Sequence, residues 1–233
     1  MYDTTKNTLI KNTTIETPKE LADFIYKKVN RKPYQNILDI GSHSGALSKP
    51  FKHKKNSSII GLDINNVYED NFDKFIHKDF LTTTKNDFKD FDIDLVVSNP
   101  PFNNLMSWQF IKKVKELFGD IPMIFILPEY ILNNSKNRAI DLEKYNITKI
   151  VKLNQNTFEG VAIHSSVVFF NINFKSTKLF EYYYPKKEIK GRVRTLYFTR
   201  EQEEFLKAKK IKNFTKYIKE LIQEKHSDFP MKK

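Results

Sequence analysis

Cysteine is absent from the 233 residues of the chain, and glycine is scarce, with only six residues. The absence of cysteine excludes disulfides, thiolate metal ligands and a cysteine nucleophile. No apolar run approaches the roughly 18 residues that a membrane span needs, and the polar N-terminal residues lack the pattern of a signal peptide. We therefore expect a soluble protein of the cytoplasm with no membrane partner.

Acidic residues are also in the minority, because 40 Lys and Arg stand against 28 Asp and Glu, for a net charge of +12. Residues 175–233 hold 17 of the basic and 8 of the acidic residues, so nine of the twelve excess charges fall there. Such an asymmetry indicates a polyanionic partner such as nucleic acid. The alternative is a solvated basic helix that packs on the main domain.

Short apolar segments alternate with helical patterns over residues 18–174. Helical spacing occurs at 18–30, at about 105–117 and at 135–145. The segments that read as strands are 36–40, SSIIGLDIN, FIHKDF, DIDLVVS, PMIFILP, ITKIVKL and HSSVVFFNINF. This alternation predicts an α/β fold with a seven-stranded, mostly parallel sheet that ends in a hairpin. We expect one domain over residues 1–174 and a small, basic, partly helical extension over 175–233.

Polar or special residues follow four of these strands in chain order. In DIGSHSG, Asp39 precedes a tight turn around Gly41 and Gly45, which predicts a helix start and a backbone that a ligand can approach closely. A plain strand-to-helix turn would look the same. Because ligands of such sheets bind at the carboxyl ends of the strands, the four sites together predict a binding edge.

The next two strand ends carry carboxylates. Asp63 lies 24 residues after Asp39, where an acidic residue is placed to hydrogen-bond ribose hydroxyls. Asp79 is followed by Phe80, and a carboxylate beside an aromatic ring suits the amino group of adenine. Each aspartate alone would be better explained by capping a turn or by a surface position, but together with the glycines they describe a slot for a nucleoside.

The fourth strand end is the sequence SNPPFNN. Asn99 offers an amide oxygen and Pro100 a backbone oxygen, and two acceptors can hold both hydrogens of a planar amine. The stiff Pro100-Pro101 pair would position these acceptors in advance, and Phe102 offers a flat face on which a base can stack. This arrangement predicts an activated exocyclic amine that attacks an electrophilic methyl group.

NPPF, together with the upstream segments DIGSHSG, GLDIN and HKDF, resembles the class I S-adenosylmethionine-dependent methyltransferases that modify planar amino groups. The order of these motifs, with TPKELADFI near the N-terminus, resembles the gamma group of DNA adenine N(6)-methyltransferases. That group includes the Taq-type enzymes and the modification subunits of type I restriction systems. The resemblance covers about residues 17–172. It implies a Rossmann-like fold, S-adenosylmethionine as cofactor, and methylation of the 6-amino group of a flipped adenine in DNA.

The resemblance also assigns residues. The catalytic residues would be Asn99, Pro100, Pro101 and Phe102. The cofactor would be held by Thr17, Pro18, Asp39, Gly41, Gly45, Asp63, Ile64, Asp79, Phe80 and Asn99. The target base would lie between Phe102 and Phe158. One departure from the family pattern is His43, which stands where the turn often has a third glycine, so that its side chain would either crowd the cofactor or point to solvent.

The basic extension adds candidates for contacts with the nucleic-acid backbone. These are Lys186, Lys187, Lys190, Arg192 and Arg194, in a stretch that also carries aromatic residues. The segment is short for reading a long DNA site, so a short recognition sequence or a partner protein that supplies specificity is expected. The histidines have no metal-ligand spacing, and we expect no metal.

Other functions remain open. NPPF also occurs in RNA guanine N(2)-methyltransferases, which often have histidine next where this chain has Asn103, and in enzymes that methylate a glutamine of release factors. Adenine in RNA would fit the same pocket. A catalytically silent nucleic-acid-binding subunit would keep the fold, and His43 is the feature that favours it.

Overall fold

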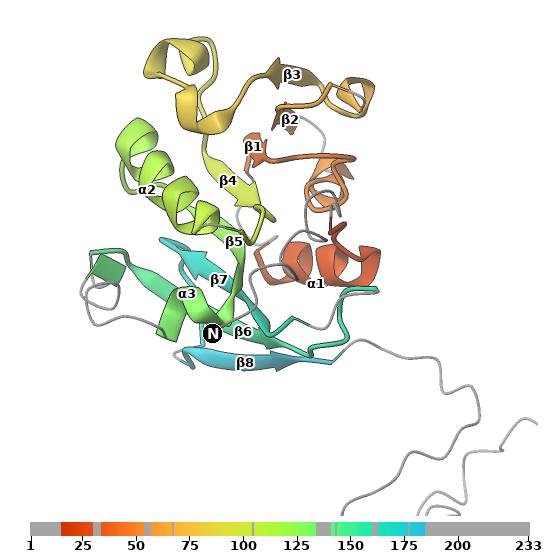
Figure 1. The fold of residues 1–233 in the computed structure, drawn as a ribbon, viewed down its shortest axis with the longest axis vertical. Helices are drawn as coiled ribbons and strands as arrows, with labels where there is room; N and C mark the ends of the chain where they lie inside the picture. The colour runs from red at the N-terminus through yellow and green to blue at the C-terminus, as the bar shows by residue number, and fades with distance from the viewer. Residues whose placement is uncertain are drawn as a thin grey trace, which may run out of the picture. The chain divides into compact units, whose positions relative to one another are not determined.

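The computed structural model describes residues 15–29, 34–53, 57–66, 68–103, 105–133, 141–142, 144–159, 163–176 and 178–184. These residues form one eight-stranded sheet in the order β3-β2-β1-β4-β5-β7-β6-β8 (Figure 1). The strands are β1 (Asn36–Ile40), β2 (Ser58–Asp63), β3 (Lys74–His77), β4 (Leu95–Ser98), β5 (Met123–Pro128), β6 (Ile147–Leu153), β7 (Ser165–Phe170) and β8 (Phe180–Tyr183).

Every pair of neighbouring strands is parallel except the pairs that β7 makes with β5 and β6, which are antiparallel. The predicted α/β fold with a mostly parallel sheet and a β6–β7 hairpin is therefore confirmed, with eight strands in place of seven. The additional strand, β8, follows residue 174, so the described sheet extends beyond the boundary expected for the first domain.

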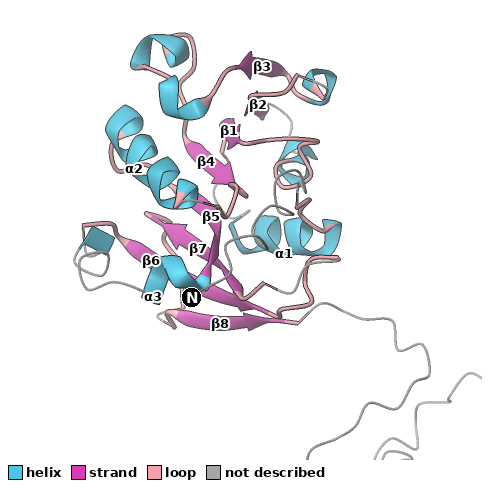
Figure 2. Ribbon diagram, viewed as in Figure 1, coloured by secondary structure: helices cyan, strands magenta, loops and turns pink. Residues whose placement is uncertain are grey.

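The α-helices defined within the described residues (Figure 2) are α1 (Lys19–Val29), α2 (Met106–Phe118) and α3 (Glu129–Asn133). The first two confirm the helices expected at 18–30 and 105–117, whereas most of the helix expected at 135–145 lies outside the described residues. Short 3₁₀ helices fill other connections: η2 (Lys49–His53), η3 (Glu69–Asn71), η4 (Phe80–Thr82) and η5 (Lys85–Phe88). None of the helices in the described ranges is long and apolar enough to cross a membrane.

The prediction that a helix begins after DIGSHSG was wrong. Turns and the 3₁₀ helix η2 connect β1 to β2 instead. Gly45 has a positive φ of 75°, and Pro50 cannot donate a backbone hydrogen bond, so this segment contains two residues that disfavour a continuous α-helix. The glycine turn is therefore followed by a compact connection.

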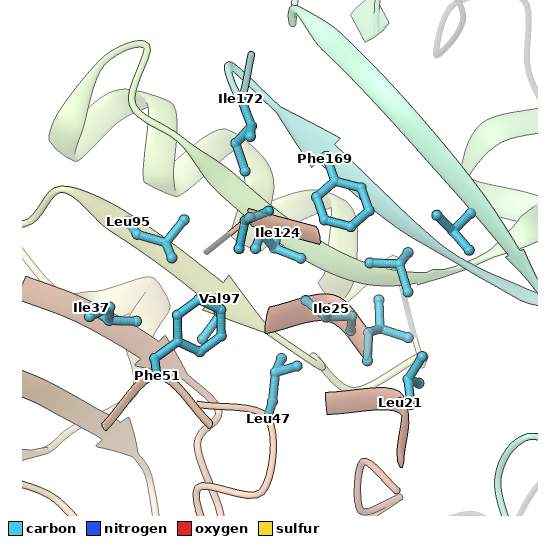
Figure 3. Close-up of a cluster of buried hydrophobic side chains, with 14 of the residues drawn as sticks. Leu21, Ile25, Ile37, Leu47, Phe51, Leu95, Val97, Ile124, Phe169 and Ile172 are labelled. Carbon is cyan, nitrogen blue, oxygen red and sulfur yellow. The ribbon is translucent and has the colours of Figure 1, made fainter. Parts of the chain in front are cut away.

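Both faces of the central strands are buried. On one face, Leu21 and Ile25 of α1 pack in a cluster with Ile37, Val97 and Ile124 of the sheet (Figure 3). On the other face, α2 supplies apolar side chains to a second cluster that contains the alternate strand residues. The strands β4 and β5 are buried along their whole length. The polar residues that directly follow the carboxyl ends of such buried strands therefore mark where the sheet reaches the surface.

β8 is fixed to the sheet by a buried cation. The Lys149 side chain of β6 is 2% exposed, and its Nζ donates to Glu181 Oε1 at 2.7 Å and to the backbone oxygen of Lys178 at 2.9 Å. Lys28 of α1 donates to the other carboxylate oxygen of Glu181. These two ammonium groups lower the pKa of Glu181. The network therefore joins β8 to both β6 and α1.

Candidate active site at the carboxyl ends of the strands

The glycine turn after β1 is anchored to the end of β2. The backbone N–H groups of Gly41 and Ser42 donate to the oxygen of Leu62 at 2.8 and 3.2 Å. Gly41 has a φ of +65°, and a Cβ added there would meet nothing closer than a Phe110 carbon at 3.9 Å. At Gly45 an added Cβ would lie 3.0 Å from the Phe72 ring. A side chain at Gly41 would thus begin with only an ordinary contact, whereas a side chain at Gly45 would press on the Phe72 ring.

Asp63 holds the same turn from the end of β2. Its Oδ2 accepts from the backbone N–H of His43 at 3.0 Å, and its Oδ1 accepts from the N–H of Asn65 at 2.9 Å. Carboxylate oxygens have further lone pairs, so both oxygens can still accept from hydroxyl groups. The neighbouring Ile64 side chain is 64% exposed and gives this end of the sheet an apolar surface.

His43 adopts a φ of +43°, the left-handed region in which the family pattern often has glycine. Its ring lies edge-on against Tyr68, with ring centroids 4.6 Å apart. The side chain that replaces the expected glycine is therefore held by an aromatic neighbour near Asp63.

Asp39 lies at the buried base of the site. Its Oδ2 has no hydrogen-bond partner among the described residues, and the same is true of the Ser42 hydroxyl. The pKa of Asp39 is raised to about 7, mainly by burial and in smaller part by the nearby Asp63 carboxylate, while hydrogen bonds with Ser48 act in the opposite direction. A buried acceptor without a partner is uncommon in proteins and indicates a place for a donor from a ligand.

Asp79 and Phe80 serve the local fold in this structure. Asp79 Oδ1 accepts from the N–H of Leu81 at 2.9 Å and caps η4. The Phe80 ring is 1% exposed and packs edge-on against Phe110, with centroids 5.1 Å apart. Of this pair, Asp79 is therefore exposed, whereas the Phe80 ring is occupied by packing within the protein.

Asn99 is oriented by the segment that precedes α1. Its Nδ2 donates to the backbone oxygen of Ile15 at 2.9 Å and to Thr17 Oγ1 at 3.2 Å. A backbone oxygen only accepts, so the contact with Ile15 fixes which side of the amide carries the nitrogen. The Oδ1 atom is buried and has no partner among the described residues. Asn99 thus has an oriented amide whose buried oxygen has no partner in the described part of the chain.

Three residues that the sequence did not indicate hold the NPPF segment. Ser98 Oγ donates to the oxygen of Ile40 at 2.7 Å, and Ser107 Oγ donates to the oxygen of Pro101 at 3.1 Å. The Tyr130 hydroxyl of α3 donates to the backbone oxygen of Phe102. The position of Ser107 in the first turn of α2 was a usable signal, but nothing in the sequence relates Tyr130 to Phe102.

Other predicted site residues lie at the edges of this arrangement. The oxygen of Pro18 accepts from the N–H groups of Leu21 and Ala22 at 3.0 Å, so Pro18 directly precedes α1 and accepts the first hydrogen bonds of the helix. Phe158 is 2% exposed within the first core cluster, against which the partly buried Phe102 packs. Phe158 therefore offers almost no surface to a base in this conformation. The basic residues proposed for backbone contacts, 186–194, lie outside the described residues.

No protein-family model matches the chain. A stretch of 77 residues is 42% identical to the release factor glutamine methyltransferase of Fusobacterium nucleatum, and it covers 29% of this chain and 22% of that protein. The chain thus spans about a fifth of this curated relative.

The fold has similar solved structures. A protein assigned to the class I S-adenosylmethionine-dependent methyltransferases of Listeria monocytogenes superposes with a TM-score of 0.55 at 15% identity, over 75% of this chain and 68% of that one. The methyltransferase subunit of a type I restriction-modification system of Streptococcus thermophilus gives a TM-score of 0.54 at 15% identity, over 70% of this chain and 46% of that one. The chain therefore has the Rossmann-like fold of class I methyltransferases.

Proposed function

We propose that this protein transfers a methyl group from S-adenosylmethionine to the exocyclic 6-amino group of an adenine in DNA. The observation that carries the proposal is the amide of Asn99, whose nitrogen is held by Ile15 and Thr17 while its oxygen is buried without a partner in the described part of the chain. An acceptor held in this way at the carboxyl end of β4 suits a planar NH₂ group.

The residues at the ends of β1 and β2 fit the proposed cofactor. The unpartnered oxygens of Asp39 and Ser42 suit the ammonium group of its amino-acid part, because a positive donor satisfies a buried carboxylate. Asp63 has lone pairs left for the ribose hydroxyls, and the exposed Ile64 offers an apolar face for a purine. When bound, the cofactor supplies an electrophilic methyl group on a positively charged sulfur.

The acceptors of the NPPF segment would make the amine reactive. The lone pair of an exocyclic amine is delocalised into the ring, so the amine is a weak nucleophile. Asn99 Oδ1 and the backbone oxygen of Pro100 would each accept one amine hydrogen and favour tetrahedral geometry at nitrogen. The nitrogen lone pair would then be free to bond to the methyl group that the bound cofactor supplies, as the carbon–sulfur bond breaks, and the extra proton would leave to solvent.

Contacts within the protein that stiffen the NPPF segment support this proposal. Ser107 and Tyr130 hold the oxygens of Pro101 and Phe102, and the proline rings limit the backbone between them. Catalysis by such a site depends on alignment more than on a strong base. Phe102 is the ring on which the target base would stack, and Phe158 would join it only after leaving its buried position.

The choice of DNA rests on the resemblance to the gamma group and on the basic excess after residue 175. Adenine or guanine in RNA would suit the same acceptors, because a flipped base enters the pocket without its helix. A glutamine side chain is a second candidate, since its carboxamide is also a planar NH₂ group and a 42% identical stretch is shared with a glutamine methyltransferase. As in a modification subunit, a separate protein could supply sequence recognition.

The deciding experiment offers radiolabelled S-adenosylmethionine and four acceptors in parallel: duplex DNA, single-stranded DNA, ribosomal RNA and a glutamine-containing peptide. Label recovered as N(6)-methyladenine in DNA, and lost with Asn99→Ala, would support the proposal. Label in RNA or peptide alone would move the protein to that substrate class. If calorimetry detects no cofactor binding and no acceptor is labelled, the protein is a silent subunit.

A further inference from the structure

The edge strand β8 presents a row of aromatic side chains to solvent. Phe180, Tyr182 and Tyr184 are 55%, 68% and 73% exposed, and we call these three residues the aromatic row. The rings of Tyr182 and Tyr184 are stacked, with centroids 6.4 Å apart and planes 23° apart. Large rings usually gain stability by burial, so a contiguous exposed set marks a surface that binds something.

The aromatic row faces away from α1. Tyr183 packs against Phe24 of α1, with ring centroids 4.8 Å apart, and Glu181 is bonded to Lys28 of the same helix. Successive side chains of a strand point to opposite faces, so Phe180, Tyr182 and Tyr184 share the other face. The one carboxylate of β8 is therefore turned from the aromatic row and is neutralised by Lys28 and Lys149.

The carboxyl end of β8 lies at the same edge of the sheet as the candidate active site. β8 is parallel to β6, and β5 and β6 are both antiparallel to β7, so β8 runs in the direction of β4 and β5. Tyr184 thus follows β8 at the edge where Asn99 follows β4. Four strand spacings separate β8 from β4, which is about 19 Å across the sheet. Bases that stack at about 3.4 Å per residue cover this distance in about five or six nucleotides.

We propose that the aromatic row stacks on unpaired bases of the nucleic-acid strand that flank the target nucleotide. This inference rests on the proposed function, and it adds that the substrate is bound where it is single-stranded. Aromatic side chains bind any unpaired base through its flat face, whereas the faces of paired bases are covered by their neighbours in the duplex.

The sequence that contains and follows β8 is basic, which favours a nucleic acid over an apolar protein partner. Residues 175–194 carry seven Lys and Arg and two acidic residues, of which Glu181 points to the other face. The register partner of Tyr182 on β6 is Lys152, which is paired with Glu129 at 3.0 Å, so this neighbour adds no net negative charge. Aromatic rings within a basic stretch are what single-strand binding uses.

The test compares Tyr182→Leu, which keeps an apolar side chain but removes the ring, with Tyr182→Phe, which keeps the ring. Binding of a fluorescein-labelled single-stranded 20-mer is followed by anisotropy at several salt concentrations. We expect Tyr182→Leu to bind about tenfold more weakly and Tyr182→Phe to bind within about twofold of the wild type. Tyr182→Leu removes a stacking ring but no charge, so the slope of log affinity against log salt concentration should be the same as in the wild type.

Three controls make the outcome decisive. Melting temperature and affinity for S-adenosylmethionine should match the wild type in both variants, and a blunt duplex of the same sequence should show a smaller difference between them. Equal affinity of all three proteins for the 20-mer would overturn the inference, as would sedimentation showing that Tyr182→Leu abolishes pairing of two copies. Ring-dependent strand binding without methyl transfer to any acceptor would instead refute the proposed function and leave the aromatic row as a binding surface.

Discussion

Asn99 Nδ2 lies 2.9 Å from the backbone oxygen of Ile15, a residue 84 positions earlier in the chain. The contact joins the loop after β4 to the segment that leads into α1, and Thr17 Oγ1 adds a second acceptor at 3.2 Å. With the nitrogen held twice, the amide cannot turn, so Asn99 Oδ1 remains directed away from these partners. The orientation of the proposed catalytic acceptor thus depends on residues far from it in sequence.

Asn99→Ala is expected to lower kcat by about 10² to 10³, because it removes an acceptor that acts on the amine in the transition state. Affinity for S-adenosylmethionine, measured by calorimetry, should stay within about twofold of the wild type. If the variant instead loses the cofactor while retaining turnover at saturation, Asn99 serves binding and the assigned role is wrong.

Thr17→Val tests whether Thr17 positions Asn99. Valine keeps the shape of threonine and removes one hydrogen bond, worth about 1 kcal/mol, so kcat should fall roughly fivefold while KM for the acceptor changes little. Thr17→Ser keeps the hydroxyl and should restore most of the activity. Equal rates for the valine and serine variants would show that the hydroxyl has no part in orienting the amide.

The sheet and its strand-end sites were predictable because their signals are local. Apolar segments that end in Asp39, Asp63 or Asn99 combine a strand with a polar end within a few residues. The predicted helices at 18–30 and 105–117 had the same kind of signal in their spacing. These patterns each lie within one short stretch of sequence, and the structure agrees with them. The helix expected after DIGSHSG is the exception, because turns and a 3₁₀ helix follow β1 instead.

What escaped prediction depends on contacts between distant segments. No local pattern relates Tyr130 to Phe102, or Lys149 to Glu181 of the eighth strand. The family resemblance implies that the Phe158 ring lies beside the target base, yet the packing of the first core cluster buries this ring. Such contacts arise from the fold as a whole, so they become visible only once the strands are paired.

Asp39→Asn should reveal the cost of burying a carboxylate. The pKa of Asp39 is raised from 3.8 to about 7, so the folded protein holds a proton that the unfolded chain releases near pH 4. Its contribution to stability therefore falls as pH rises from about 4 to about 7 and is constant above that, a loss of about 4 kcal/mol. Asparagine does not titrate and should lack this loss.

The measurement is urea unfolding of both proteins at pH 4 to 8. The free energy of unfolding of the variant, relative to the wild type, should rise with pH and level off above about pH 7. Other titrating groups cancel in this difference. A difference that does not change with pH would mean that Asp39 ionises in the folded protein as it does in the unfolded chain.

Glu181→Gln should destabilise the protein more than Lys149→Met does. Glu181→Gln leaves the buried ammonium of Lys149 without its carboxylate, and breaking a buried ion pair in this way costs about 3–5 kcal/mol. Lys149→Met removes the buried charge, while Glu181 keeps Lys28 as a partner at a more exposed position. Chemical unfolding of the two variants ranks them, and the reverse order would show that the cation is not the costly partner.

Gly61 of β2 should not tolerate a side chain, because a Cβ added there would lie 2.6 Å from the ring of Phe72. Gly61→Ala forces the buried ring or the strand to move, and such overpacking costs about 1–3 kcal/mol. The Phe72→Leu change makes room, so the double variant should be more stable than the sum of the two single effects predicts.

Gly119→Ala is the matched control, since nothing lies within 4 Å of its added Cβ. Gly119 has a φ of +73°, so alanine there should lower the free energy of unfolding. This decrease should be the same whether position 72 is phenylalanine or leucine. Strictly additive effects of Gly61→Ala and Phe72→Leu in a urea-unfolding cycle would show that the ring does not limit this position.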